Sequence, residues 1–282
     1  MNKLTTKGTF CAIFGALMVI IASTQNAAAG RRAFYLEDQY WNPDAALQTR
    51  CKNSNYNTLF LFTMQIDADG ALRYNDHKLV DTNGTWVGGS WNSKIAGCRG
   101  GAVASIEVCI GNWGTQSFNH VRDLVAAGSP KLRKNFTVLK QNMPTLDAIQ
   151  MDDETTYDRH SMVALCSMIT DVGFAKVTLC PYTNSGFWAG VKSDLGSRVG
   201  AVWLQCYDGG ASNVPLNWKS ALGNTSVLYP GLWYFDGKTA VKSKMTTWHN
   251  QGFNGGFLLG GGSVPGGLPD STWCQQLIDA GF

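Results

Sequence analysis

Short apolar segments alternate with helix-patterned segments along this chain, and this alternation restricts its possible folds more than any other feature. Helices between consecutive strands supply the crossover connections that parallel strands need. Eight such alternations predict an α/β fold, a single (β/α)8 TIM barrel, in preference to an open sheet. The expected strands cover residues 33–36, 58–66, 102–110, 146–152, 175–180, 201–206, 226–232 and 256–259, and the clearest helix patterns cover residues 118–127, 130–142, 160–172, 240–250 and 271–280.

The N-terminal segment has the pattern of a secretory signal peptide. Two lysines precede an apolar stretch over residues 10–22, and small residues follow at 27–29. The apolar stretch is too short for a stable membrane span, although a retained anchor is the alternative. We therefore expect a signal peptide at 1–29 and one soluble, secreted, monomeric catalytic domain at 30–282 that is not attached to a membrane.

The composition excludes some classes of partner. A net charge of +3, spread along the chain, does not indicate a nucleic-acid-binding protein. Charged residues make up only 15% of the chain, whereas aromatic residues make up 11% and include ten tryptophans. Such a surface suits stacking on sugars, but a large core would have the same composition. The four histidines are scattered and no C-x-x-C occurs, so we expect no metal and no cofactor.

The cysteines indicate one disulfide in an exported chain. One of the eight lies in the predicted signal peptide, and the odd number that remains cannot all pair within the chain. Cys51 and Cys98 lie in polar, turn-rich segments and are the expected disulfide. Apolar strand patterns surround three others, which we expect to be buried thiols: Cys109, Cys180 and Cys206.

The segment 146–154 carries the strongest chemical signal. Alternate side chains of a strand share a face, so Gln150, Asp152 and Glu154 point one way and Asp153 points the other. Residues two apart on a strand lie roughly 6.6 Å from each other at Cα, close enough for two carboxyls to raise one another's pKa. An acid and a neighbouring carboxylate at a strand end suit general acid catalysis. The alternative is an edge strand with a solvated acidic end.

The segment 147–154 resembles the D-x-x-D-x-D-x-E signature of glycoside hydrolase family 18, which includes chitinases and endo-β-N-acetylglucosaminidases. Three of the four acidic positions match, and Gln150 occupies the other. Further segments resemble other family motifs in the same order along the chain: 108–114, 129–136, 179–182, 203–208 and 229–232.

The resemblance implies a barrel without a large α+β insertion and a retaining mechanism in which the 2-acetamido group of the substrate is the nucleophile. Glu154 would be the general acid and then the base. Asp152 would hold the acetamido N–H, and Tyr207 the acetamido oxygen. The candidate substrate-binding residues are Tyr207, Asp208, Gln150, Gln205, Trp113 and Tyr182.

Two positions depart from the family pattern. Gln150 can hydrogen-bond to Asp152 but cannot share a proton with it, and Gly260 falls where many chitinases have a tryptophan beneath the sugar. We expect a secreted glycosidase that hydrolyses β-1,4 N-acetylglucosamine linkages in chitin or chitooligosaccharides. The alternatives are an endo-β-N-acetylglucosaminidase acting on N-glycan cores, a catalytically weak chitinase-like lectin, and an enzyme inhibitor built on the same barrel.

Overall fold

The structure is a computed structural model that describes residues 30–36, 38–112, 114–260 and 269–282. The predicted signal peptide lies outside the described residues. Among the described residues, no helix has the length and apolar character needed to cross a membrane.

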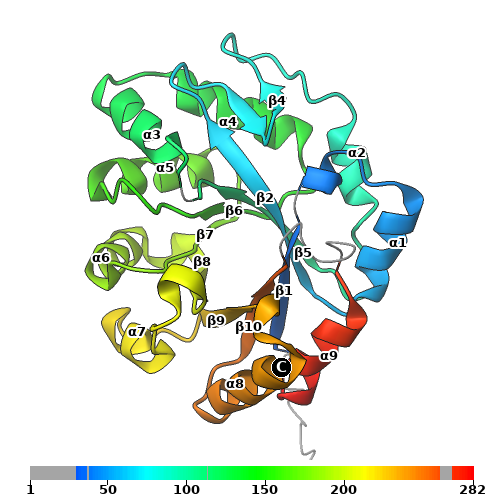
Figure 1. The fold of residues 1–282 in the computed structure, drawn as a ribbon. Helices are drawn as coiled ribbons and strands as arrows, with labels where there is room; N and C mark the ends of the chain where they lie inside the picture. The colour runs from blue at the N-terminus through cyan, green and yellow to red at the C-terminus, as the bar shows by residue number, and fades with distance from the viewer. Residues whose placement is uncertain (1–29, 37, 113, 261–268) are drawn as a thin grey trace, which may run out of the picture.

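Parallel strands form a closed barrel at the centre of the molecule (Figure 1). Each strand pairs with the next, and the last pairs with the first, so every barrel strand has two neighbours. Gly255 permits this closure, because a Cβ there would lie 2.4 Å from the carbonyl oxygen of Arg31. The predicted TIM barrel and its eight strands are confirmed: β1 (Arg31–Leu36), β2 (Thr58–Ile66), β5 (Ser105–Ile110), β6 (Ala148–Met151), β7 (Lys176–Leu179), β8 (Val199–Gln205), β9 (Leu228–Trp233) and β10 (Gly255–Leu259).

Helices surround the barrel (Figure 1). The five predicted helices are confirmed to within two residues at each end: α3 (Ser117–Ala126), α4 (Lys131–Asn142), α5 (Arg159–Asp171), α8 (Lys238–Asn250) and α9 (Ser271–Asp279). Four further helices were not predicted: α1 (Ala45–Asn53), α2 (Trp91–Ala96), α6 (Ser185–Leu195) and α7 (Pro215–Ala221). In α6 two glycines weaken the helical signal. Its start is instead fixed by Asn184, whose side chain accepts a hydrogen bond from the backbone of Phe187.

A hairpin extends the sheet beyond the barrel, and the sequence did not predict it. Strand β3 (Leu72–Tyr74) pairs antiparallel with the outer end of β2, and β4 (His77–Val80) pairs antiparallel with β3. The hairpin region packs against α4, where Asn135 donates a hydrogen bond to the carbonyl oxygen of Gly70 at 2.6 Å. The β2–β3 turn is therefore held in a fixed position above the barrel.

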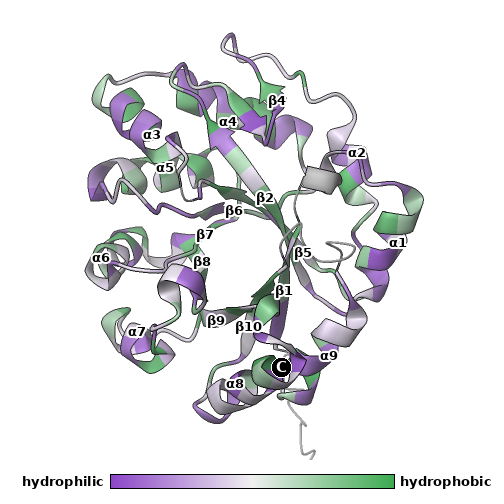
Figure 2. Ribbon diagram, in the orientation of Figure 1, coloured by the Kyte–Doolittle hydropathy of each residue, from purple (hydrophilic) through white to green (hydrophobic). Residues whose placement is uncertain are grey.

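Apolar side chains fill both sides of the barrel wall. One cluster lies between strands and helices, and a smaller one fills the barrel interior with rings from β1, β2, β8, β9 and β10. Figure 2 shows the barrel strands mostly in the hydrophobic colour. One buried acid interrupts the interior: Glu107 of β5 is 1% exposed and accepts a hydrogen bond from the Thr178 hydroxyl at 2.6 Å. Burial raises the pKa of Glu107 to about 7.

The cysteines differ in part from expectation. Cys109, Cys180 and Cys206 are buried free thiols, as predicted. Cys51 and Cys98 are also buried free thiols, so the expected polar surroundings are wrong: α1 and α2 pack these residues into the core. The structure therefore has no bridge between Cys51 and Cys98. Their thiols nevertheless share a hydrogen bond, which places the sulfurs next to each other.

Candidate active site

Two carboxyl groups meet just beyond the end of β6. Asp152 is 4% exposed, Glu154 is half-buried, and their side chains share a hydrogen bond. Asp153 points away from them and accepts hydrogen bonds from the backbone of Thr155, Thr156 and Tyr157, which form the next turn. Because alternate side chains of a strand point to opposite faces, Asp152 and Glu154 come together, whereas Asp153 points to the other face and stabilises the loop.

An amide from another strand holds this pair. The Nε2 atom of Gln205, at the end of β8, donates to Oδ1 of Asp152 at 2.9 Å and to Oε1 of Glu154 at 3.3 Å. The same amide lies 3.3 Å from the carbonyl oxygen of Cys180, at the end of β7. Gln205 therefore fixes the position of both carboxyls relative to the barrel wall.

The surroundings favour a shared proton on the pair. Burial raises the pKa of Asp152 well above its usual range, and the neighbouring charge of Glu154 raises it further. Burial also raises the pKa of Glu154, to which the charge of Asp208 contributes. The N–H of Gln205 opposes both shifts because it stabilises the ionised carboxylates. The two groups titrate together and can retain one proton where ordinary carboxyls have lost theirs.

A cavity of about 580 Å³ opens above the carboxyl pair at the carboxyl ends of the strands. The structure brings six predicted residues together in its wall: Asp152, Glu154, Tyr182, Gln205, Tyr207 and Asp208. It adds five that were not predicted: Tyr35, Phe62, Asn112, Gly209 and Leu259. These residues lie within or just after barrel strands or beside Asp208. Their position near strand ends is the sequence feature from which they could have been predicted.

Tyr207 is 7% exposed and lies beside the carboxyl pair. Burial raises the pKa of its phenol well above the usual range, and the charges of Cys180, Asp152 and Glu154 add to the shift. Its hydroxyl group therefore keeps its proton and remains a hydrogen-bond donor. The neighbouring Asp208 begins a short 3-10 turn (Asp208–Gly210) at the cavity wall.

Gln150 does not line the cavity and does not hold Asp152. It is fully buried in the barrel, where its Oε1 accepts a hydrogen bond from the Tyr35 hydroxyl at 2.6 Å. Its Nε2 has no hydrogen-bond partner among the described residues. The expectation that the Gln150 amide contacts Asp152 is therefore corrected, because Gln205 makes that contact. Trp113 lies outside the described residues.

The first acid of the signature has a structural role. Asp147 lies just before β6, at the opposite end of this strand from the cavity, and forms an ion pair with Arg99 at 2.5 Å. It also accepts a hydrogen bond from the backbone of Ile106 at 2.8 Å. Asp147 thus fixes the start of the strand that carries the carboxyl pair.

Gly260 follows the last barrel strand and is buried beside Phe34. A Cβ at this position would lie 2.4 Å from Cζ of Phe34, so any larger residue would require the buried ring to move. The preceding residue, Leu259, reaches the cavity wall. Position 260 therefore does not supply the ring that a tryptophan places beneath the sugar in many chitinases.

Metal-ligating residues are not grouped in the described part of the chain: no three or more His, Cys, Asp or Glu side chains are arranged to hold a metal ion. The chemistry available at the carboxyl pair is that of two coupled carboxyls, the amide of Gln205 and the phenol of Tyr207.

Comparisons with known proteins show the fold. No protein-family model and no curated protein matches the chain. The spore cortex-lytic enzyme SleL of Bacillus cereus is 13% identical, with a TM-score of 0.61 over 89% of this chain and 74% of that one. A chitinase-like agglutinin from Robinia pseudoacacia is 11% identical, with a TM-score of 0.62 over 87% and 99% of the two chains. A class V chitinase from Nicotiana tobaccum, solved with NAG4, is 10% identical, with a TM-score of 0.59 over 90% and 99%.

The similarity to family 18 chitinases and chitinase-like proteins predicted from the motifs is thus confirmed at the level of structure. The relatives include both hydrolases and an agglutinin, so the shared fold alone does not distinguish catalysis from sugar binding.

Proposed function

We propose that this chain is a secreted glycosidase that hydrolyses β-1,4 linkages of N-acetylglucosamine with retention of configuration. The observation that carries the proposal is the hydrogen-bonded pair of Asp152 and Glu154 at the wall of the barrel cavity. A carboxyl that stays protonated by burial can act as a general acid near neutral pH.

Glu154 is the proton donor in this proposal because it is the more exposed member of the pair. It transfers its proton to the glycosidic oxygen as the bond to the anomeric carbon breaks. The acetamido oxygen of the substrate attacks that carbon and forms an oxazolinium ion. The ionised Glu154 then removes a proton from water, which opens the ring with overall retention.

Asp152, Gln205 and Tyr207 orient the nucleophilic acetamido group. Asp152 accepts a hydrogen bond from the N–H of the acetamido group and stabilises the positive charge of the oxazolinium ion. The phenol of Tyr207 donates a hydrogen bond to the acetamido oxygen. Gln205 acts through the pair, since its amide holds both carboxyls. Each of these contacts strengthens as charge develops, which is the requirement for transition-state stabilisation.

A sugar-binding lectin is the second candidate. The structural similarity to an agglutinin and the absence of a side chain at Gly260 favour it. Against it, a buried and a half-buried carboxyl with raised pKa values cost folding free energy, and binding of a neutral sugar does not require them.

Hydrolysis of a fluorogenic chitobioside, followed over acidic and neutral pH, tests the proposal. We expect release of the fluorophore, with the newly formed sugar first in the β configuration by NMR. Calorimetry with chitooligosaccharides would identify a lectin if it detects binding by a chain that shows no turnover at any pH.

A further inference from the structure

Asn213 joins two strand ends beside the carboxyl pair. It lies between the 3-10 turn Asp208–Gly210 and α7, and it is half-buried. Its Nδ2 donates to the carbonyl oxygen of Tyr182, just after β7, at 2.7 Å, and to the carbonyl oxygen of Gln205, at the end of β8, at 2.8 Å. Tyr182 and Gln205 both line the cavity of the candidate active site. One amide therefore holds two neighbouring parts of the cavity wall from behind.

The orientation of the Asn213 amide is fixed by α7. Its Oδ1 accepts a hydrogen bond from Nε1 of Trp218 at 2.9 Å, and Trp218 is buried, which keeps the indole in place. Because an indole N–H only donates, the oxygen of the amide faces Trp218 and its Nδ2 faces the two carbonyl oxygens. The 3-10 turn packs against the same contact, since a Cβ at Gly210 would lie 2.3 Å from the carbonyl oxygen of Gln205.

The backbone that Asn213 holds belongs to the residue whose side chain holds the carboxyl pair. Nε2 of Gln205 lies 2.9 Å from Oδ1 of Asp152 and 3.3 Å from Oε1 of Glu154. The second distance is already beyond the usual range of about 2.7–3.2 Å for an N–H···O hydrogen bond. A small displacement of the Gln205 backbone would therefore break that contact first and weaken the other.

We propose that Asn213 is a positioning residue, which keeps the Gln205 amide within hydrogen-bonding distance of both Asp152 and Glu154. The inference rests on the proposed function, in which Glu154 is the proton donor and Asp152 stabilises the oxazolinium ion. In the described part of the chain, Asn213 is not among the residues that line the cavity, so it acts through the wall and not by contact with substrate.

Asn213→Leu tests this role, because it removes both donated hydrogen bonds at nearly constant volume. The displaced Gln205 amide then stabilises the ionised carboxylates less. We expect the pH profile of kcat/KM to move to higher pH, in the same direction as for Gln205→Met and by a smaller amount. We expect kcat to fall by about 10-fold, less than the roughly 100-fold that a misplacement of about 1 Å can cost. The other titratable groups that face the pair are kept in this variant: Asp153, Asp208, Tyr207, Cys180, Cys109 and Tyr35.

Trp218→Phe is a milder variant that keeps the packed ring and removes only the N–H that orients the Asn213 amide. It should shift the profile in the same direction as Asn213→Leu and by less. An unshifted profile in both variants would overturn the inference, whatever their effect on the rate.

A double variant shows whether Asn213 acts through Gln205. Asn213→Leu added to Gln205→Met should move the profile no further than Gln205→Met alone, because the amide through which Asn213 acts is already gone. Additive shifts would mean that Asn213 reaches the pair by another route, and they would overturn the inference.

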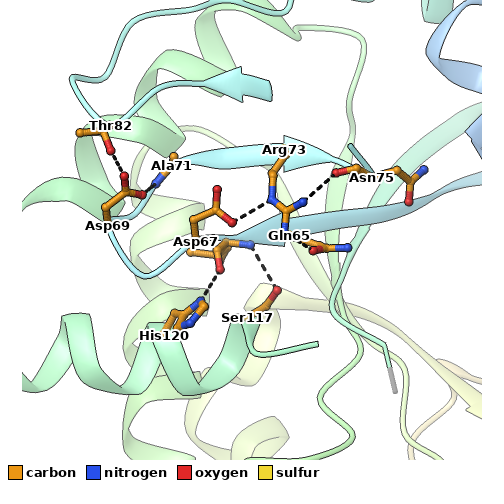
Figure 3. Close-up of polar contacts among 10 residues, drawn as sticks. Gln65, Asp67, Asp69, Ala71, Arg73, Asn75, Thr82, Ser117 and His120 are labelled. Atoms are coloured by element: carbon orange, nitrogen blue, oxygen red, sulfur yellow. Dashed lines mark hydrogen bonds and ion pairs between the residues drawn. The ribbon is translucent and has the colours of Figure 1, made fainter. Parts of the chain in front are cut away.

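Contacts that hold β2 supply the controls. At the outer end of this strand, the Ser117 hydroxyl accepts a hydrogen bond from the backbone of Ile66 at 3.2 Å, and Nδ1 of His120 lies 2.8 Å from the carbonyl oxygen of Ile66 (Figure 3). At the opposite end, the side chain of Asn57 donates one hydrogen bond and accepts another, each at 2.9 Å. Ser117→Ala and Asn57→Leu should lower stability and leave the pH profile in place. A shift in either control as large as that of Asn213→Leu would overturn the inference.

NMR titration of isotopically labelled carboxyls separates this inference from the proposed function, because it needs no turnover. If the wild-type chain hydrolyses no chitobioside, the proposed function fails and the position of the pair is judged from this titration alone. Higher titration midpoints of Asp152 and Glu154 in Asn213→Leu than in Asn57→Leu support the role of Asn213, and equal midpoints reject it.

Discussion

Tyr35 of β1 donates its phenolic hydrogen to Oε1 of Gln150 on β6, at 2.6 Å, inside the barrel. The two residues are 115 positions apart, and their contact lies beneath the carboxyl pair. The hydroxyl of Tyr35 is also 3.0 Å from the sulfur of Cys180. Position 150 is therefore part of a buried polar layer under the candidate site and does not line the cavity.

Gln150→Asp should shift or broaden the pH profile of kcat/KM. The new carboxyl would share a strand face with Asp152, one pleat deeper, and a buried carboxyl near two others couples to their titration. Its negative charge raises the pKa of its neighbours, so the change should be toward higher pH. Steady-state rates across pH measure it.

Gln150→Asn is the matched control for this change, because it shortens the side chain equally without adding a charge. We expect its profile to keep the wild-type midpoints. A folded Asp variant whose profile matches that of the Asn variant would show that position 150 is not coupled to the pair.

Glu154→Gln should abolish hydrolysis while sugar binding persists. The amide is nearly the same size as the carboxyl but cannot donate a proton to the leaving oxygen, a loss of about 10²- to 10⁴-fold. Turnover of a chitobioside measures this loss, and calorimetry with a chitooligosaccharide measures the retained affinity. Near wild-type turnover by this variant would remove Glu154 from the mechanism.

Gln205→Met should move both limbs of the pH profile to higher pH and lower kcat. The Gln205 amide donates to ionised Asp152 and Glu154 and so holds their pKa values down. Loss of this donor raises both pKa values, so each carboxyl loses its proton at a higher pH than in the wild type. A purely structural role would lower the rate without moving the profile.

Glu107→Gln should stabilise the protein above neutral pH. The pKa of Glu107 rises from 4.5 in the unfolded chain to about 7 in the fold, so the folded state binds the extra proton. Stability is therefore lost as pH rises from 4.5 to about 7, by on the order of 3 kcal/mol. The amide of the variant does not ionise, so denaturant unfolding at pH 4.5 and above pH 7 should show a smaller loss of stability in the variant than in the wild type.

The control for this prediction is Asp76→Asn, which removes an exposed carboxyl from the turn between β3 and β4. It should leave the pH dependence of the unfolding free energy as in the wild type. If Glu107→Gln retains the full wild-type pH dependence, the buried carboxyl is not its source.

Oxidation should join Cys51 and Cys98. Their thiols share a hydrogen bond in the core, so little movement is needed for a bond between the sulfurs. Such a bridge typically contributes about 2–4 kcal/mol to stability. Peptide mapping of oxidised protein should recover the linked pair, whereas Cys166, next to Met162 on α5, should stay a thiol. Free thiols at 51 and 98 in secreted protein would refute this.

The barrel was predictable from the sequence because each strand is a local apolar segment between turn residues. The hairpin of β3 and β4 was not, since these strands have three and four residues and polar side chains interrupt them. Their pairing depends on the outer end of β2, whose extension beyond the barrel has no local signal.

The carboxyl pair was predictable for the same local reason, because strand alternation places Asp152 and Glu154 together. Their partners were not. Gln205 reaches the pair only through the registers of β6, β7 and β8, and Tyr35 reaches Gln150 across the barrel. Contacts between distant segments depend on closure of the sheet, and a single sequence does not specify that register.

Because β10 closes the barrel, the candidate site can form only late in the synthesis of the chain. This strand is the last of the barrel yet pairs with β1, the first, and its Leu259 lines the cavity of the candidate site. A nascent chain that lacks β10 leaves β1 and β9 without a partner on one side and the cavity without part of its wall. The candidate site is therefore assembled only after β10 has left the ribosome, and under the proposed function shorter nascent chains would not hydrolyse glycans.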